Sequence, residues 1–188
     1  VQTCALPIYS MASLKEIIQR INRTTKDMFA ATFIELQEKF GEVFGKFFPG
    51  GRAELQLVEE PPAENGDGSG HQEPGIDIVA QPPGKRLKSI TMLSGGEKTL
   101  TAMALLFASF LIRPTPFCLL DEIDAPLDEE NIGRFTDVLR DLAQNAQFLV
   151  ITHNKRTMGI ADSLFGVTME EPGVSKLVSV RLGDLQAV

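Results

Sequence analysis

A long amphipathic pattern runs from Ser13 to the helix-breaking sequence Pro49-Gly50-Gly51. Apolar residues recur there mostly every three or four positions, which is the spacing of one face of an α-helix. The first part has a narrow apolar seam and much polar surface, as coiled-coil ends do, whereas the second part is rich in phenylalanine and needs a broad apolar partner. We therefore predict that residues 11–48 form the end of a coiled coil followed by a Phe-rich helix.

Two stretches after this helix alternate apolar and polar residues, which is the period of a β-strand. One contains Ala53, Leu55 and Leu57, the other is residues 75–80 (GIDIVA), and we predict that the two strands pair. Residues 59–74 between them are acidic and of low complexity. They hold too few apolar side chains to pack, so we predict a flexible loop there.

The second half of the chain alternates between helical and strand patterns. We predict helices over residues 94–112, 128–143 and 155–161, and strands over residues 117–121, 148–152, 164–169 and 175–182. Strands flanked by helices indicate an α/β fold with a largely parallel sheet covered by helices. In such sheets the functional residues gather at the carboxyl ends of the strands.

Composition and charge exclude several classes of protein. With 43% hydrophobic and 23% charged residues the chain is in the globular range. No uninterrupted apolar run reaches the roughly 20 residues of a bilayer span, which argues against an integral membrane protein. Two cysteines are too few for a disulfide framework, so we expect a reducing, cytoplasmic compartment. The net charge of −7 argues against coating nucleic acid through net charge alone.

Two shorter segments stand apart from these patterns. Residues 1–10 (VQTCALPIYS) have neither the features of a secretory signal nor a clear period, and we predict a foreign or disordered leader. Residues 81–88 (QPPGKRLK) form a predicted irregular connection that carries Lys85, Arg86 and Lys88. This basic segment is the best local candidate for contact with a phosphate backbone, although such a loop is usually only solvated.

The sequence Leu93-Ser94-Gly95-Gly96-Glu97-Lys98 opens the most apolar predicted helix. Ser94 and Glu97 have the spacing of a capping box. Two consecutive glycines weaken a helix start by roughly 1 kcal/mol each relative to alanine, unless another group must approach the backbone closely. The bare N–H groups and the positive end of the helix dipole suit an anion such as a terminal phosphate. The sequence is compatible with either a purely structural helix cap or a phosphate-binding site.

A second group of polar residues follows two apolar strands. Asp121 and Glu122 end the first, and there Asp121 could hold Mg²⁺ while Glu122 acts as a general base or positions a water. Asp128 has the position of an N-cap for the next helix. His153 follows the second strand at the same predicted edge of the sheet. The alternative is that these residues only cap turns.

Taken together, LSGGEK, FCLLDEIDAPLD and ITHNK resemble the carboxyl-terminal half of an ABC-type ATPase head, a P-loop NTPase fold. The resemblance is specifically to the SMC (structural maintenance of chromosomes) proteins of bacteria, and it spans about residues 14–182. By matching position it implies that Leu93, Ser94, Gly95, Gly96, Glu97 and Lys98 form the signature motif, which contacts the γ-phosphate of ATP on an opposite head. The cofactors implied are ATP and Mg²⁺.

The same resemblance assigns roles to the residues after the strands. Asp121 matches the Walker B aspartate that supports Mg²⁺, and Glu122 matches the catalytic glutamate. Residues 125–128 match the D-loop, which ends at Asp128, and His153 matches the switch histidine. The phosphate-cradling pattern G-x-x-x-x-G-K-[ST] occurs nowhere in the chain. In SMC proteins that loop lies in an amino-terminal lobe, so residues 49–188 resemble the carboxyl-terminal lobe alone.

The resemblance implies an ATPase of chromosome condensation and segregation, nucleoid-associated, whose isolated carboxyl-terminal lobe is inactive. The implied partners are the amino-terminal head lobe of the same protein, a second SMC head in a homodimer, a kleisin subunit, and DNA through the assembled complex. One alternative is a non-catalytic module that binds kleisin and a head lobe in trans. Others are a related DNA-repair ATPase and, more remotely, a transporter nucleotide-binding domain.

Overall fold

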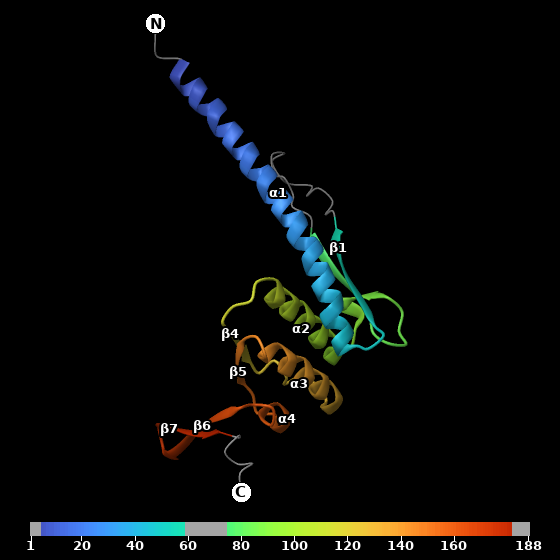
Figure 1. Ribbon diagram of the computed structural model, residues 1–188, viewed down its shortest axis with the longest axis vertical. Helices are drawn as coiled ribbons and strands as arrows, with labels where there is room; N and C mark the ends of the chain where they lie inside the picture. The colour runs from blue at the N-terminus through green and yellow to red at the C-terminus, as the bar shows by residue number, and fades with distance from the viewer. Residues whose placement is uncertain (1–4, 59–74, 182–188) are drawn as a thin grey trace.

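The computed structural model describes residues 5–58 and 75–181. The predicted acidic loop 59–74, residues 1–4 and the predicted strand residue Leu182 lie outside the described residues. The molecule is elongated (Figure 1), with the start of the first helix at one end and the last two strands at the other. The remaining helices and strands lie between these two ends, beside the carboxyl end of the first helix.

Helix α1 (Ala5–Phe47) is the predicted long helix, and it begins six residues before the predicted range of 11–48. Its backbone therefore includes residues 5–10 of the predicted leader. Leu14, Ile17 and Ile21 in its first half are each more than half exposed. In its last turns Phe44 and Phe47 are fully buried. The first half of the helix is thus largely exposed, and its last turns belong to the hydrophobic core.

Strands β1 (Arg52–Val58) and β2 (Gly75–Gln81) pair as predicted, and the pairing is antiparallel, with Leu55 opposite Ile78. A short strand, β3 (Lys88–Ser89), adds to β2 in the segment predicted to be irregular, and a 3-10 turn, η1 (Ile90–Met92), follows. Gly51 joins α1 to this sheet. A Cβ atom there would lie 2.9 Å from the Gln81 carbonyl oxygen, so only glycine fits without a shift.

A strand–helix–strand unit follows helix α2 (Gly95–Ile112). It consists of β4 (Phe117–Asp121), α3 (Glu129–Ala143) and β5 (Gln147–Ile151), and its two strands pair in parallel. All three of these elements, and α2, were predicted within one or two residues. The helical crossover is the standard way to bring two parallel strands side by side.

Helix α2 is at the centre of the packing. Among the described helices it is the one long and apolar enough, by length and composition, to cross a membrane. In this fold its apolar side chains fill the core: the Phe107 ring centroid lies 6.3 Å from that of Phe47 and 6.4 Å from those of Phe135 and Phe148. These aromatic contacts join α1, α3 and β5 through α2.

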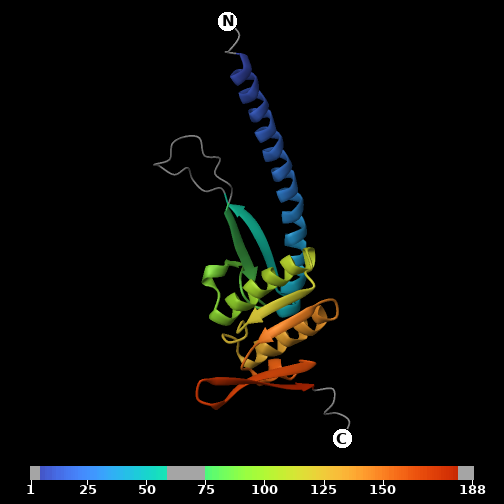
Figure 2. The same cartoon turned by 90° about the vertical axis from the view of Figure 1, so that its left-hand side faces the viewer.

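The two faces of the β4–β5 sheet have different surroundings. On the face formed by Cys118, Leu120, Phe148 and Val150, called the core face, the side chains pack into the main hydrophobic cluster. On the opposite face, called the bare face, Phe117, Leu119, Leu149 and Ile151 are 47–60% exposed. Figure 2 shows the two strands on the viewer's side of α2 and α3. The helices therefore cover one face only.

The last elements are α4 (Lys155–Met158) and the hairpin of β6 (Ser163–Glu171) and β7 (Val174–Arg181). The hairpin is antiparallel and turns at Gly173, whose φ is +85°. The α/β class is confirmed, but the prediction of a largely parallel sheet is wrong for the described residues. Only β4 and β5 are parallel there, because the other strands form an antiparallel sheet and a hairpin.

Candidate functional site

The carboxyl ends of β4 and β5 bring three of the predicted site residues to one edge. Asp121 is paired with Ile151 in the parallel ladder, and the Glu122 N–H donates to the Ile151 carbonyl oxygen at 2.9 Å. His153 follows two residues after Ile151. The side chains of Asp121, Glu122 and His153 are all exposed. The edge thus presents two carboxylates and an imidazole to whatever approaches it.

Glu122 has a backbone conformation that the sequence does not reveal. Its φ is +47°, the only positive φ at a non-glycine position among the described residues. Residues other than glycine, asparagine and aspartate seldom adopt a positive φ. Those that do are concentrated at functional sites. Strand alternation therefore stops at Asp121, and the direction of the Glu122 side chain is set by the turn rather than by the strand.

The start of α2 is the second part of the site. Ser94 is the N-cap and forms the predicted capping box with Glu97, whose carboxylate accepts the Ser94 backbone N–H at 3.1 Å. The same carboxylate pairs with Lys85 Nζ at 2.8 Å. Burial raises the pKa of Glu97, but hydrogen bonds from Lys85 and Ser94 outweigh burial, and the pKa is lowered. Glu97 therefore stays ionised and holds the basic segment against the helix start.

The two glycines at this helix start differ in their surroundings. A Cβ atom on Gly95 would meet no atom within 4 Å, so the backbone there is open to an approaching group. A Cβ atom on Gly96 would lie 3.3 Å from Asn131 Nδ2. Gly96 thus lies close to the first turn of α3. Of the neighbouring residues, Lys98 is exposed and Leu93 is buried in the core.

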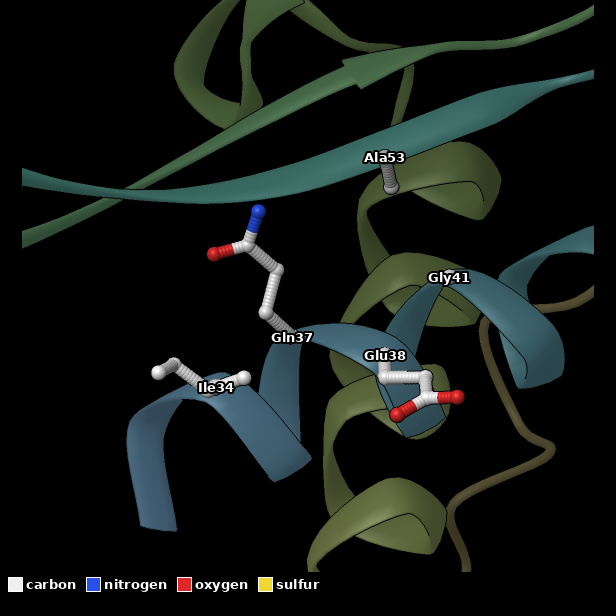
Figure 3. A pocket seen from close by; sticks show the side chains of 5 residues that line it. All are labelled: Ile34, Gln37, Glu38, Gly41 and Ala53. Carbon is white, nitrogen blue, oxygen red and sulfur yellow. The ribbon is translucent and has the colours of Figure 1, made fainter. Parts of the chain in front are cut away.

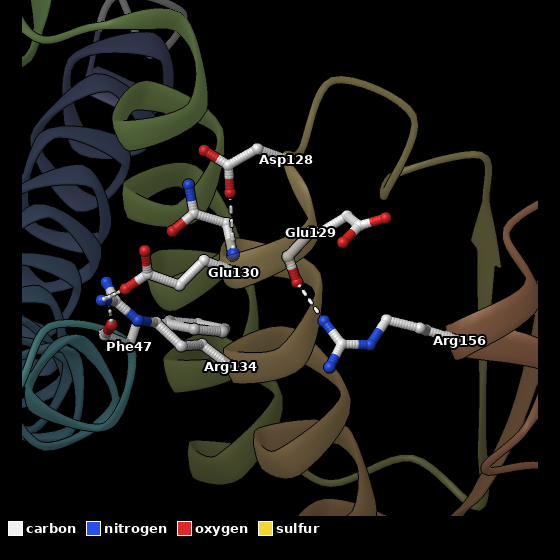
Figure 4. Close-up of polar contacts among 7 residues, drawn as sticks. Phe47, Asp128, Glu129, Glu130, Arg134 and Arg156 are labelled. Carbon is white, nitrogen blue, oxygen red and sulfur yellow. Dashed lines mark hydrogen bonds and ion pairs between the residues drawn. The ribbon is translucent and has the colours of Figure 1, made fainter.

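The start of α3 connects the site to the rest of the fold (Figure 4). Asp128 is its N-cap, as predicted, and accepts the Asn131 N–H at 2.8 Å. Arg134 pairs with Glu130 and donates to the Phe47 carbonyl oxygen at the end of α1. Arg156 reaches from α4 to the Glu129 carbonyl oxygen at 2.5 Å. The first turn of α3 is therefore tied to both α1 and α4.

Sequence reasoning did not single out Asp124, which is 1% exposed. Its carboxylate accepts hydrogen bonds from Thr152 and Thr157, which are 28 and 33 residues further along the chain. The sequence shows that Asp124 belongs to the DEID motif, but it does not show that Asp124 bonds to residues so far along the chain. Asp124 therefore links the turn that carries Glu122 to the loop that carries His153.

The donor set for a metal ion is sparse. No group of three His, Cys, Asp or Glu side chains is placed to hold a metal within the described ranges 5–58 and 75–181. Mg²⁺ is usually held through one or two carboxylates together with substrate phosphates and waters. Asp121, an exposed carboxylate at a strand end, fits one position of such a mixed set.

A shallow hollow lies away from this site, between α1 and β1 (Figure 3). Its lining comes from Ile34, Gln37, Glu38, Gly41 and Ala53. Gln37 and Glu38 are its only side chains that carry polar groups. None of the predicted site residues lines this hollow, so it is separate from the chemistry of the strand ends.

Comparison with known proteins places the chain in a family. The family model described as the RecF/RecN/SMC N terminal domain matches residues 11–176. The chromosome partition protein Smc of Myxococcus xanthus is 55% identical over 178 residues, and that of Halobacteriovorax marinus is 48% identical over 173. These alignments cover 95% and 92% of this chain. The chain spans only 14% of each relative's length.

Solved structures give the same result. A Pyrococcus furiosus Smc head domain with an extended coiled coil, bound to the C-terminal domain of ScpA, has a TM-score of 0.75 and 40% identity. It covers 93% of this chain, which in turn covers 42% of that one. A second chain, from work on ATP-driven dimerisation and DNA-stimulated activation of SMC ATPases, has a TM-score of 0.71 at 40% identity. It covers 86% of this chain, which covers 92% of it. The chain belongs to the RecF/RecN/SMC family, and its fold is similar to part of the head domain of SMC ATPases.

Proposed function

We propose that the chain is the carboxyl-terminal lobe of the ATPase head of a chromosome-partition SMC protein. In this proposal it supplies the signature motif, the Walker B aspartate, the catalytic glutamate, the D-loop and the switch histidine. A separate amino-terminal lobe supplies the phosphate-cradling loop, because G-x-x-x-x-G-K-[ST] is missing from this sequence. Hydrolysis then takes place between two engaged heads.

The observation that carries the proposal is the bare face of the β4–β5 sheet. Parallel sheets in α/β proteins are normally covered on both faces. Here Leu119 is 60% exposed and Ile151 is 50% exposed, although both lie in paired parallel strands. Asp121 lies on this same side of β4, at its carboxyl end. A second lobe placed against the bare face would cover the apolar side chains and bring its phosphate loop to that edge.

Each site residue has a chemical role in this proposal. Mg²⁺, when bound, neutralises charge on the transferred phosphate, and Asp121 supplies one of its ligands. The Glu122 carboxylate accepts a proton from the attacking water or orients it. The open N–H groups at Gly95 bind the terminal phosphate of the nucleotide held by the opposite head. His153 and Asp128 border the same space and orient groups across the interface between heads.

The proposed partners extend beyond ATP. Head structures similar to this chain were solved with the C-terminal domain and with the C-winged helix domain of ScpA, and we propose a kleisin of that kind as a partner. A second copy of the head and DNA, held by the assembled complex, complete the set. We propose the nucleoid in the cytoplasm as the place of action. The basic segment of residues 81–88, which includes Lys85, remains a candidate DNA contact.

A second function is favoured by the terminal hairpin. Phe165, Val167 and Leu177 on one face of β6–β7 are each about two thirds exposed or more. An exposed apolar hairpin is suited to binding another protein. The chain could then act as an interaction module that hydrolyses nothing itself. This alternative shares the fold and the partners but requires no contribution from Glu122.

The experiment that separates the two functions uses the purified chain mixed with a separately expressed amino-terminal head lobe. The main proposal expects ATP hydrolysis in the mixture and none in either part alone. It also expects Glu122→Gln to abolish hydrolysis while the lobes still associate, because the amide keeps the shape but cannot accept a proton. Hydrolysis that persists in Glu122→Gln would contradict the role of this residue. Association without hydrolysis in the unmodified mixture would favour the interaction module.

A further inference from the structure

Asp124 is a buried carboxylate in the turn between Glu122 and Asp128. Its side chain is 1% exposed, whereas Glu122 and Asp128 are exposed. The turn is closed by backbone hydrogen bonds from the Ala125 N–H to the Glu122 carbonyl oxygen at 3.2 Å and from the Leu127 N–H to the Asp124 carbonyl oxygen at 3.1 Å. Asp124 therefore belongs to the same small rigid unit as Glu122.

One oxygen of this carboxylate accepts two hydroxyl groups from the other side of the site. Thr152 Oγ1 donates to Asp124 Oδ2 at 2.7 Å, and Thr157 Oγ1 donates to the same oxygen at 2.5 Å. Thr152 directly follows β5, and Thr157 is a buried residue of α4. Asp124 thus fastens the start of the loop after β5, at Thr152, and helix α4, at Thr157.

The hydrogen bonds continue to the other side of His153. Thr152 Oγ1 accepts the Asn154 backbone N–H at 2.9 Å, and Asn154 Oδ1 in turn caps α4 by accepting the Arg156 N–H at 2.9 Å. The residues on both sides of His153 are therefore held by one network that starts at Asp124. His153 itself is exposed and forms no part of it. The network fixes the backbone of this residue and leaves its imidazole free to act.

The second carboxylate oxygen argues against a purely stabilising role. Asp124 Oδ1 is buried and has no hydrogen-bond partner among the described residues. A buried acceptor without a partner destabilises a fold. A residue that holds two loops in a set geometry needs an acceptor at this point.

We propose that Asp124 is a positioning residue that holds the His153 loop in register with Glu122 through its hydrogen bond to Thr152. This inference rests on the proposed ATPase function of the site. The backbone bond from Glu122 to Ile151 sets the spacing of the two strand ends, and the Asp124–Thr152 bond sets the loops beyond them. A catalytic group displaced by about 1 Å can lower the rate about 100-fold. Loss of this bond therefore lowers turnover without removing any group that touches the nucleotide.

The kinetic test uses the chain mixed with the amino-terminal head lobe. Asp124→Leu and Thr152→Val are expected to lower kcat by about 100-fold, with the KM for ATP unchanged, because the phosphate loop of the other lobe governs binding. Asp124→Asn is expected to keep most of the activity, since an amide oxygen can accept both hydroxyls. Rescue by Asn but not by Leu identifies the acceptor, and not the charge, as the feature that matters.

Thr157→Val is the matched control. Like Thr152→Val, it is an isosteric change that removes a hydroxyl donor to Asp124 Oδ2. Unlike Thr152→Val, it leaves the hydrogen bonds of Thr152 to Asp124 and Asn154 in place. The proposal expects its kcat to match that of the unmodified protein even where its denaturation midpoint falls. If Thr157→Val lowers kcat as much as Thr152→Val does, the effect is one of general stability, and the proposal is wrong.

A second measurement is independent of ATP and uses the isolated full chain. The sequence has two histidines, so NMR of the imidazole Cε1–H groups gives one signal from each, and His153→Gln assigns them. Thr152→Val and Asp124→Leu are expected to shift the His153 signal and to speed hydrogen exchange of the Asn154 N–H, whereas Thr157→Val leaves both unchanged. An unmoved His153 signal in Thr152→Val would overturn the proposal.

Glu122→Gln in the same mixture keeps the two proposals distinguishable. If Glu122→Gln abolishes hydrolysis and Asp124→Leu leaves kcat intact, the site is an ATPase but Asp124 does not position it. If Glu122→Gln leaves hydrolysis intact, the proposed ATPase site is wrong, and the kinetic prediction for Asp124 is wrong as well. The NMR result then decides separately whether Asp124 holds the His153 loop.

Discussion

The two faces of the β4–β5 sheet are built from the same kinds of residues but have opposite environments. On the core face Leu120 is 2% exposed, and on the bare face its neighbour Leu119 is 60% exposed. Both are leucines in the middle of one five-residue strand. Strand alternation alone sends one side chain to each face. The difference lies in what covers each face: α2 and α3 cover the core face, whereas the apolar side chains of the bare face stay 47–60% exposed.

This difference indicates that the bare face is suited to packing against further protein. A strand meant for solvent on one face alternates apolar and polar residues, whereas β4 reads as a nearly continuous apolar run. The first half of α1 has the same character, with an exposed seam that includes Leu14 and Ile21. The chain also spans 14% of the length of its Smc relatives. Both surfaces are therefore suited to contacts with further protein.

The largest expected effect separates the two faces by stability. Leu120→Ala removes a buried side chain and leaves a cavity, so it is expected to lower the free energy of unfolding by about 2–5 kcal/mol. Leu119→Ala removes an exposed side chain and is expected to change that free energy by less than about 0.5 kcal/mol. Urea denaturation of the isolated chain measures both. Equal losses in the two variants would mean that the bare face is covered in solution.

The second effect concerns association. Leu119→Asp places a charge on the bare face, and we expect it to weaken binding of the amino-terminal head lobe by at least about tenfold, as the loss of a central contact in an interface does. Leu177→Asp is the matched control, since Leu177 is 66% exposed but lies on the terminal hairpin. Calorimetric titration measures both. Unchanged affinity in Leu119→Asp would show that the lobe binds elsewhere.

The smallest effect is the pH dependence of the capping box at the start of α2. The pKa of Glu97 lies below its ordinary value of 4.5, so its contribution to stability is full above that value and is lost as the pH falls through the lowered pKa. Lys85→Met removes the ion pair, moves the pKa of Glu97 back upward and lowers stability at neutral pH by less than about 1 kcal/mol. Acid denaturation curves of the two proteins should therefore converge at low pH. Parallel curves would contradict this role of Lys85.

Most helices and strands could be predicted because their signals are local. The Ser94 and Asp128 caps and the apolar run of β4 each depend on neighbouring residues. The sheet arrangement could not be predicted in the same way. An apolar strand such as β4 looks the same whether it has one parallel partner or several, and so the prediction of a largely parallel sheet overreached.

The site shows the same division. The positions of Asp121 and His153 at one edge followed from strand ends and were confirmed by the pairing of Asp121 with Ile151. The left-handed backbone of Glu122 and the link from Asp124 to Thr152 were not visible, because one is a strained local geometry and the other joins residues 28 positions apart. The chemical roles assigned through the family resemblance stay predictions.

The most direct test of the central claim is a calorimetric titration of ATP with Mg²⁺ into the isolated chain and into the chain mixed with the amino-terminal head lobe. We expect no detectable heat of binding for the isolated chain and clear binding for the mixture, because in the proposed head the nucleotide is held by a loop that this sequence lacks. Binding to the isolated chain with a dissociation constant near about 1 μM, equivalent to about −8 kcal/mol, would contradict the claim that the chain holds only half of the nucleotide site.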